Sequence, residues 1–384
     1  MRILSLLTYY HPHWTGLTAH AQRLAEGLAR RGHEVTVLTS RYPPGLAPVE
    51  VCGGVRVVRL PVLARISRGV VMPALPAAAW RLIRSHDVVQ FHTPMLEAWL
   101  ITALARRAGK PALMTHHGDL VMPGRPFDRV VERSVTWLMA RAERGAAAIS
   151  VYGRDYADHS TFLRPFRAKL VYIRPPIEIP PPDRTAAAAW RRELGLDRAR
   201  VVGFAGRFVE EKGFDILLEA LPLVRERVPT AKLVFAGETR VVYERFFARC
   251  RHLVERHRDH LVLLGLIRDR QRLAQFYAMS DVFALPSRTD ALAAVQVEAM
   301  LCGTPVVASD IAGAREPVGL TGMGRLVRPG DRAALAEALV EVASQPERFT
   351  RSRDAVRAVF DPERSVCEYE ALLGALAEGR AVGS

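Results

Sequence analysis

Short apolar segments alternate with helical patterns along this chain, and the series occurs twice, on either side of a proline-rich break. The apolar segments have the length of buried strands, and alternating strands and helices predict parallel sheets covered by helices on both faces. In the first half these segments are residues 3–7, 35–39, 55–59, 88–91, 112–115, 147–150 and 170–173, and in the second half 201–204, 232–235, 261–264, 282–285 and 304–308.

Helical patterns lie between most of these strands. The first ends before Gly32, a residue type that commonly stops a helix. The simplest architecture is α/β, with two doubly wound, Rossmann-like domains facing each other across a cleft. The predicted helices are residues 18–31 in the first half, 215–228, 242–256, 270–279, 294–301 and 331–342 in the second, and one near the C-terminus at 362–378.

The break between the two series, at residues 174–182, holds five prolines in nine positions. Proline has no N–H to donate and fixes its own backbone, so this stretch can form neither a helix nor a central strand. We therefore predict an N-terminal domain at 1–174, a linker at 175–185, a C-terminal domain at 186–360 and a final helical segment at 361–384.

Charge is distributed unevenly over the 384 residues, which carry a formal net charge of +14. The first 174 residues hold 24 Lys and Arg against 11 Asp and Glu, whereas the remainder holds 30 against 29. A basic first half suggests an anionic partner such as lipid headgroups, nucleic acid or a phosphorylated substrate, although an arginine-rich composition alone could produce it. Four scattered cysteines, no apolar run of about 20 residues and no secretory signal predict a cytoplasmic protein.

A turn with two glycines and two cations follows the first strand of the second half. Residues 206–213 read Gly-Arg-Phe-Val-Glu-Glu-Lys-Gly and precede an amphipathic helix. Glycine lets the backbone approach a ligand, a helix N-terminus favours negative charge, and Arg207 and Lys212 can neutralise phosphate oxygens. This turn predicts a site for a diphosphate.

Several segments, in the same order, resemble the retaining GT-B-fold glycosyltransferases of family 4. Besides the turn at 206–213, they are Arg31-Gly32-His33-Glu34-Val35, Leu285-Pro286-Ser287 and the run Val-Glu-Ala-Met-Leu-Cys-Gly-Thr-Pro-Val-Val-Ala at 297–308, the most specific match. The resemblance covers nearly the whole chain. It implies sugar transfer from a nucleotide-diphosphate sugar to an acceptor hydroxyl, which a lipid or a polysaccharide could carry, with retention at the anomeric carbon. It also implies an acceptor-side first domain, a donor-binding second domain and a C-terminal helix that packs back on their junction.

The resemblance assigns the donor phosphates and sugar to four residues of the second half. Gly206, Arg207 and Lys212 would hold the diphosphate and stabilise the departing nucleotide, and Asp290 would contact the donor sugar. Asp290 stands where the family usually has glutamate. The family's Gly-Phe-Gly-Leu is replaced after it by Ala291-Leu292-Ala293-Ala294, which predicts an altered sugar pocket.

Further residues match the family less specifically. Glu298 would bond the ribose hydroxyls, the backbone near Ile267 would meet the base, and Glu316 would lie near the donor. In the first half, Gly16 would allow close approach of phosphate or acceptor. The segment Thr115-His116-His117-Gly118-Asp119 places His117 at the donor sugar, with His116 as the alternative, and His92 could line the acceptor side or be structural.

Missing motifs narrow the chemistry. The sequence has no Asp-x-Asp and no metal-ligand spacing, so it predicts no metal and no cofactor, and cationic side chains would take the metal's place. No Gly-x-Gly-x-x-Gly follows the first strand, which argues against a dinucleotide-dependent oxidoreductase. No nucleic-acid motif accompanies the basic charge, which argues against a nucleic-acid-binding protein. A sugar-nucleotide epimerase and a non-catalytic nucleotide- or polysaccharide-binding relative remain alternatives to the transferase.

The basic first half also predicts docking on an anionic membrane surface. Residues 60–84 interleave apolar and arginine side chains, with Pro73 and Pro76 preventing one unbroken helix. The alternative is that Trp80 and Leu82 pack on the sheet and the arginines are solvated. The apolar members named for docking are Val62, Leu63, Ile66, Val70, Val71, Met72, Leu75 and Trp80, and the basic ones are Arg65, Arg68, Arg81 and Arg84.

Overall fold

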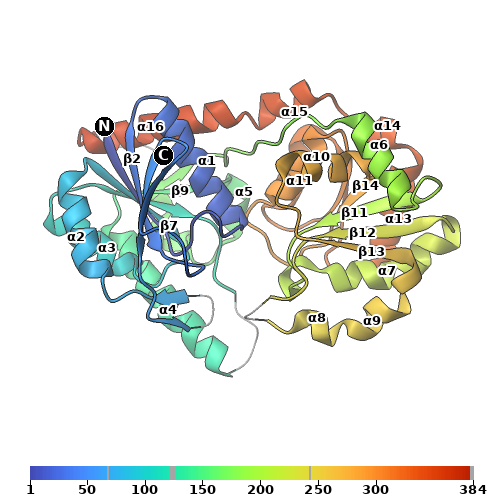
Figure 1. Cartoon of the computed structure of the whole chain (residues 1–384), viewed down its shortest axis with the longest axis horizontal. Coiled ribbons are helices and arrows are strands. Elements are labelled where there is room, and N and C mark those ends of the chain that lie inside the picture. The colour runs from blue at the N-terminus through green and yellow to red at the C-terminus, as the bar shows by residue number, and fades with distance from the viewer. Residues whose placement is uncertain (67–68, 122–125, 242–243, 381–384) are drawn as a thin grey trace. The chain divides into compact units, whose positions relative to one another are not determined.

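The computed structural model describes residues 1–66, 69–121, 126–241 and 244–380, which form two compact units. The first unit consists of Met1–Pro176 with Pro362–Ser384, and the second of Ile177–Asp361 (Figure 1). Each unit has its own sheet and its own hydrophobic core. The predicted α/β class with two doubly wound domains is confirmed.

An eight-stranded sheet forms the centre of the first unit, in the order β10-β9-β8-β7-β1-β2-β4-β3. All described neighbours are parallel except β3, which runs antiparallel to β4. A separate hairpin, β5–β6, was not predicted. The strands are β1 (Arg2–Leu6), β2 (Glu34–Ser40), β3 (Val49–Cys52), β4 (Val55–Leu60), β5 (Ala64–Ile66), β6 (Gly69–Val71), β7 (Val88–Thr93), β8 (Ala112–His116), β9 (Ala148–Val151) and β10 (Leu170–Tyr172).

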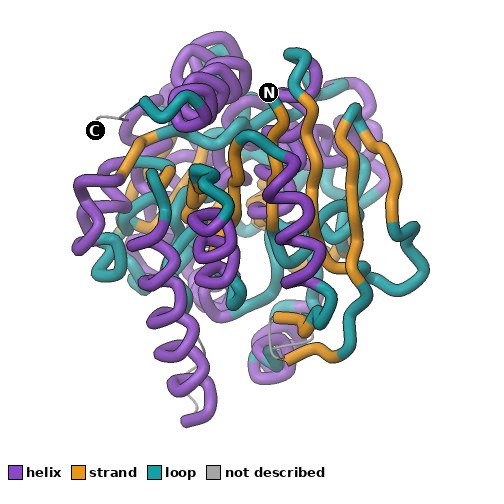
Figure 2. Tube along the Cα trace, turned by 90° about the vertical axis from the view of Figure 1, so that its left-hand side faces the viewer, coloured by secondary structure: helices purple, strands orange, loops and turns teal. Residues whose placement is uncertain are grey.

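Helices cover both faces of this sheet because the sheet grows from β1 in two directions. The connection from β1 to β2 and the connection from β7 to β8 run toward opposite edges of the sheet, and right-handed crossovers then place their helices on opposite faces. Figure 2 shows helices lying over the strands. The last helix packs beside α1, and its Tyr369 and Leu373 join the core that holds Ile3 and Leu24. The helices are α1 (Gly16–Arg30), α2 (Leu75–Ser85), α3 (Ala98–Arg107), α4 (Pro126–Gly145), α5 (Arg154–His159), the 3₁₀ turn η1 (Arg164–Lys169) and α16 (Pro362–Ala377).

The second unit has a six-stranded sheet in the order β13-β12-β11-β14-β15-β16, with every described pair parallel. Its central strands bury almost every side chain, as a parallel sheet covered on both faces requires. The strands are β11 (Arg200–Ala205), β12 (Ala231–Ala236), β13 (Leu261–Gly265), β14 (Val282–Leu285), β15 (Val306–Ser309) and β16 (Gly324–Val327).

One predicted helix of the second unit is wrong as a single element. The segment predicted at 242–256 forms two short helices that divide at Cys250, where ψ is 5° rather than helical, and residues 242–243 lie outside the described part. The helical elements are α6 (Arg184–Glu193), η2 (Glu210–Lys212), α7 (Phe214–Arg227), α8 (Phe246–Arg249), α9 (Arg251–Arg256), η3 (Arg258–His260), α10 (Arg270–Met279), α11 (Ala294–Leu301), α12 (Arg315–Thr321), α13 (Arg332–Ser344), α14 (Pro346–Phe349) and α15 (Arg353–Val359).

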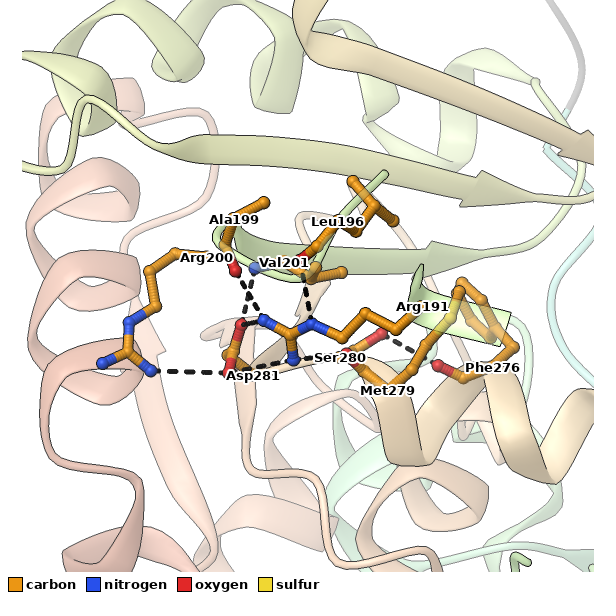
Figure 3. Close-up of polar contacts among 9 residues, drawn as sticks. All are labelled: Arg191, Leu196, Ala199, Arg200, Val201, Phe276, Met279, Ser280 and Asp281. Atoms are coloured by element: carbon orange, nitrogen blue, oxygen red, sulfur yellow. Dashed lines mark hydrogen bonds and ion pairs between the residues drawn. The ribbon is translucent and has the colours of Figure 1, made fainter. Parts of the chain in front are cut away.

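An arginine–aspartate pair ties α6 to the amino-terminal edge of this sheet (Figure 3). Arg191 Nη2 lies 2.9 Å from Asp281 Oδ2, and the same oxygen accepts the backbone N–H of Val201 at 2.6 Å. Arg191 also donates to the carbonyl oxygens of Met279, at 3.0 Å, and Leu196, at 3.1 Å. The starts of β11 and β14 are thereby held together.

The proline-rich segment packs onto the second unit. Ile177 and Ile179 are buried, and the Gln271 side chain donates to the carbonyl oxygen of Pro181 at 3.0 Å. Arg353 donates to the carbonyl oxygen of Ile179. The segment is therefore extended but anchored by side chains of the unit that follows it.

Candidate functional site

The predicted diphosphate turn lies at the switch point of the second sheet. β11 and β14 are neighbours, yet the chain continues from β11 toward β12 on one side and from β14 toward β15 on the other. Open α/β sheets bind ligands beyond the carboxyl ends of the strands at such a point. The two loops concerned are residues 206–213 after β11 and residues 286–293 after β14.

The two loops are joined by backbone and side-chain contacts. The backbone N–H of Arg288 donates to the carbonyl oxygen of Glu211 at 2.8 Å, and its guanidinium binds both carboxylate oxygens of Asp215, at 2.8 and 2.7 Å. Gly213 has φ of +68°, and a Cβ there would lie 1.9 Å from the carbonyl oxygen of Pro286. Only glycine allows the loops to approach this closely before α7 begins.

The structure brings two of the predicted site residues into direct contact. Lys212 Nζ lies 2.6 Å from Asp290 Oδ2, so the predicted phosphate ligand and the predicted sugar ligand form an ion pair across the two loops. Ser287 Oγ lies 3.4 Å from the same oxygen. Arg207 pairs with Glu211 at 3.3 Å and is partly exposed. A cation held by a carboxylate can exchange that partner for a phosphate without being newly desolvated.

The segment after Asp290 is buried rather than open. Ala291, Leu292 and Ala293 are all buried, and Ala293 precedes α11 as its N-cap residue, with no side-chain cap. Gly313, at φ of +80°, packs against this segment, because a Cβ there would lie 2.3 Å from the carbonyl oxygen of Ala291. The loop that leads to Glu316 therefore packs directly against the backbone of residues 291–293.

The remaining predicted donor residues occupy different settings in this unit. Glu298 is buried in α11, and its carboxylate accepts a hydrogen bond from the Tyr277 hydroxyl at 3.0 Å. Glu316 lies in the first turn of α12 and is half-buried. Ile267 is half-buried in the loop that leaves β13.

In the first unit, Gly16 is the first residue of α1 and stands beside open space. Thr15 caps this helix, with its Oγ1 accepting from the Thr18 N–H at 3.2 Å while Thr18 Oγ1 accepts from the Thr15 N–H at 2.8 Å. A Cβ on Gly16 would meet nothing within 4 Å. The glycine is therefore not required by packing here.

His117 lies just beyond β8, and both of its ring nitrogens have partners. Its Nε2 is 2.8 Å from Nδ1 of His92, and its Nδ1 is hydrogen-bonded to the Tyr152 hydroxyl. His92 is bonded in turn to Ser5 Oγ at 3.1 Å. Burial lowers the pKa of His92 to about 3 and holds the pKa of His117 well below its usual range. Both rings are neutral near pH 7, so they can bond hydroxyl groups without carrying charge.

His116, the alternative to His117, has a structural environment. Its Nε2 lies 3.1 Å from Asp119 Oδ1, its ring stacks on Phe162, and its side chain is fully buried. Ser160 donates to the same carboxylate at 2.8 Å. His116 therefore helps to hold the loop that follows β8, whereas half-buried His117 keeps contact with solvent.

Three contributors to these sites were missed from the sequence. Arg288 joins the two loops of the second unit, and Tyr152 and Ser5 complete the chain of hydrogen bonds through His92 and His117. Arginine in a loop, tyrosine near a strand end and serine in a strand are common, so none had a local signal. Only the strand order places them together.

Comparisons with known proteins identify the class. The family model described as "Glycosyl transferases group 1" matches residues 199–345, and the one described as "Glycosyl transferase 4-like domain" matches residues 15–176. The chain therefore belongs to the group 1 glycosyltransferases, as the resemblance indicated, and transfers a sugar to an acceptor.

Individual proteins agree with this family over most of their length. D-inositol 3-phosphate glycosyltransferase of Xylanimonas cellulosilytica is 30% identical over 89% of this chain and 87% of its own. GDP-mannose-dependent alpha-(1-6)-phosphatidylinositol monomannoside mannosyltransferase of Mycolicibacterium smegmatis is 30% identical over 88% of each chain. The structure of Anabaena Alr3699/HepE in complex with UDP and glucose has a TM-score of 0.77 at 19% identity, covering 98% of this chain and 100% of that one. These likenesses support the GT-B fold.

Proposed function

We propose that the chain is a retaining, metal-independent glycosyltransferase that takes its sugar from a nucleotide-diphosphate donor bound by the second unit. The observation that carries the proposal is the Lys212–Asp290 ion pair at the switch point of that sheet. It sets a cation and a carboxylate side by side between two loops that glycine contacts hold together. A diphosphate and the sugar joined to it need such neighbours, one cationic and one able to accept hydrogen bonds from hydroxyls.

Donor binding would rearrange this pair. A phosphate oxygen replaces Asp290 on Lys212 and frees the carboxylate to accept a sugar hydroxyl. Arg207, paired with Glu211 at 3.3 Å, supplies a second cation to the same loop. As the bond between the anomeric carbon and the diphosphate breaks, charge accumulates on the leaving group, and fixed cations stabilise it most at that point.

The anomeric configuration is retained because the acceptor attacks the sugar on the same face that the diphosphate leaves. The anomeric carbon loses its bond to the diphosphate oxygen and gains a bond to the acceptor oxygen, while the acceptor proton passes to the departing phosphate. No separate carboxylate base is needed. Two cationic side chains take the role that a divalent ion has in metal-dependent transferases.

The acceptor is proposed to be a polyol or glycan carried by a lipid and reached from the inner face of the cell membrane. The name of the Mycolicibacterium relative includes phosphatidylinositol monomannoside, and the first 174 residues of this chain are strongly basic. Among the described residues, no helix has the length and apolar character needed to cross a membrane.

The structure narrows which side chains could meet lipid. Val70, Met72 and Leu75 are buried and cannot insert. Leu82 is buried too, as the alternative to docking expects, and Arg68 lies outside the described residues. Leu63 remains 75% exposed beside the β5–β6 hairpin. On α4, Val130 and Trp137 are exposed, and the Arg141 guanidinium lies over the Trp137 ring at 4.9 Å. This helix face combines the apolar and cationic groups that an anionic bilayer attracts.

The transfer chemistry is tested with purified full-length chain, a panel of UDP-, GDP- and ADP-sugars, and phosphatidylinositol or soluble polyols as acceptors. Product anomers are assigned by NMR before they can equilibrate. The proposal predicts a product with the donor's anomeric configuration and unchanged turnover in EDTA. An inverted product, or activity restored only by Mn²⁺ or Mg²⁺ after chelation, contradicts it.

Membrane docking is tested by co-sedimentation with phosphatidylglycerol vesicles at low and high salt. Binding should weaken as salt rises, because basic groups near an anionic surface contribute about 1 kcal/mol each. Trp137→Ser should reduce binding, whereas Leu263→Ser, which removes an exposed apolar side chain from the second unit, should not. Failure to sediment at low salt would favour a soluble acceptor.

A further inference from the structure

Three histidines from separate elements meet inside the first unit. His20 comes from α1, His92 from β7 and His117 from the loop after β8. One ring nitrogen of each lies within 4.8 Å of the corresponding nitrogen of the other two. His20 is only 3% exposed and His92 only 1%. The sequence analysis named His92 and His117 separately, but their grouping with His20 had no sequence signal, because the three residues are far apart along the chain.

In two of these rings, one nitrogen, here called the outer nitrogen, is hydrogen-bonded to a hydroxyl oxygen, and the other, inner nitrogen faces the second ring. His92 Nε2 is 3.1 Å from Ser5 Oγ, and His117 Nδ1 is bonded to the Tyr152 hydroxyl. The inner atoms, His92 Nδ1 and His117 Nε2, are 2.8 Å apart. Because each neutral ring carries one proton, one inner nitrogen donates to the other when nothing lies between them, and the donating ring then accepts at its outer nitrogen. When both rings instead carry their proton on the outer nitrogen and donate it outward, both inner lone pairs are available to a metal ion placed between them.

His20 is the independent observation that points to a ligand. Both of its ring nitrogens are buried, and neither has a hydrogen-bond partner within the part of the chain that the structure describes. Its ring meets that of His117 edge-on, with centroids 4.9 Å apart, and otherwise faces His92, Tyr152 and Tyr369. Leaving a buried polar group unsatisfied costs free energy, so a bound partner for this imidazole would be favourable.

We propose that His20, His92 and His117 form a binding site for one transition-metal ion of the Zn²⁺ type. Three imidazoles without a carboxylate suit Zn²⁺, Co²⁺, Ni²⁺ or Cu²⁺, and do not suit Mg²⁺ or Ca²⁺, which prefer oxygen. Ser5 and Tyr152 orient the ligands in the way that outer hydrogen bonds orient metal-binding histidines. Zn–N bonds of about 2.0–2.1 Å in a tetrahedral site place ligand nitrogens roughly 3.3 Å apart, so modest ring movements would complete it.

A metal ion bound at this site would inhibit sugar transfer, a consequence that rests on the proposed function. The bound metal occupies His117 Nε2, so the ring assigned to the donor sugar can no longer contact it. Chelation should then leave turnover unchanged or raise it, whereas added Zn²⁺ should lower it. Metal binding itself is measured without a donor, so the site can be tested even if the proposed chemistry is wrong.

The test uses EDTA-treated, dialysed full-length chain titrated with Zn²⁺ by calorimetry and with Co²⁺ by visible absorption. We expect one site per chain with micromolar or tighter affinity, the bands of four-coordinate Co²⁺, and no response to Mg²⁺. His20→Phe should weaken binding at least 100-fold and preserve the fold, because neither His20 ring nitrogen has a hydrogen-bond partner among the described residues. His252→Phe, an exposed histidine of the second unit, is the control and should bind as wild type.

Thermal unfolding provides the second measurement. Zn²⁺ should raise the Tm of wild type and of His252→Phe, but not that of His20→Phe. If His20→Phe does not fold by circular dichroism, His20→Gln replaces it with the same expectation. Absence of stoichiometric Zn²⁺ binding to wild type, or unchanged binding in a folded His20 variant, would overturn the site.

Discussion

The two units place opposite kinds of chemistry beyond their strand ends. In the second unit, the loops after β11 and β14 carry partly exposed ionic groups, among them the Lys212–Asp290 pair. In the first, the carboxyl ends of β1, β7 and β8 carry buried neutral groups, the histidines and the hydroxyls that bond them. The same type of sheet thus carries ionic groups beyond its strand ends in one unit and buried neutral groups in the other. Burial and loop composition, rather than topology, decide which.

The largest expected effect breaks the ionic side of this comparison. Lys212→Ala or Arg207→Ala should lower kcat/KM by about 2–4 kcal/mol, roughly 30- to 1000-fold, because a cation that stabilises the leaving diphosphate is lost. Steady-state kinetics measures this, with folding checked by circular dichroism. Arg258→Ala, which removes an exposed arginine of the same unit that pairs with Asp259 outside this turn, is the control. Wild-type turnover in both site variants would remove the phosphate assignment.

Asp290→Asn separates the sugar from the phosphates. Asparagine keeps the shape but removes the charge that pairs with Lys212, so catalysis should fall much more than nucleotide affinity. Kinetics and nucleotide calorimetry on the same preparation give the two quantities. Equal losses would place Asp290 at the phosphates, and no loss in either would make it a structural loop residue.

A smaller effect, on stability, tests a buried neutral group of the first unit. Glu143 on α4 is fully buried with neither carboxylate oxygen hydrogen-bonded within the described residues, and burial raises its pKa to about 9. The folded state keeps this proton while the unfolded state releases it above about pH 4.5, so stability falls as pH rises from there toward 9. Glu143→Gln should stabilise the chain by about 1–3 kcal/mol at pH 7 and flatten this dependence.

Urea unfolding of wild type and Glu143→Gln from pH 5 to 9 measures that difference. Glu132→Gln, on the same helix and less buried, is the matched control and should follow wild type. If the gap between wild type and Glu143→Gln does not widen with pH, Glu143 is ionised in the folded chain and has a partner there.

The sequence was most informative where a side chain's environment depends on its neighbours along the chain. Periodicity placed the buried parallel strands correctly, and the glycines at 206 and 213 marked the turn before α7. It missed β3, whose Val49 and Val51 point to solvent, and β16, a short strand that begins with glycine. Nothing local marked the division between α8 and α9 at Cys250.

Site residues were predictable only where a motif held them together. Arg207 and Lys212 share one turn and could be named as a pair, but the Lys212–Asp290 contact depends on β11 and β14 being neighbours. His20 had no motif at all, because its environment is built by α1, β7, β8 and α16 together. Strand order, which a single sequence leaves open, decides both.

The central claim is that the switch point of the second unit binds a nucleotide diphosphate. The most direct measurement is calorimetric and thermal-shift titration of full-length chain with UDP, GDP and ADP in the presence of EDTA. We predict that one nucleotide binds tightly to each chain and, at 100 times its Kd, stabilises the folded chain by about 2.7 kcal/mol. The Lys212→Ala/Arg207→Ala double variant should lose that binding. Wild-type affinity in the double variant, or no binding of any of the three nucleotides, would contradict the account.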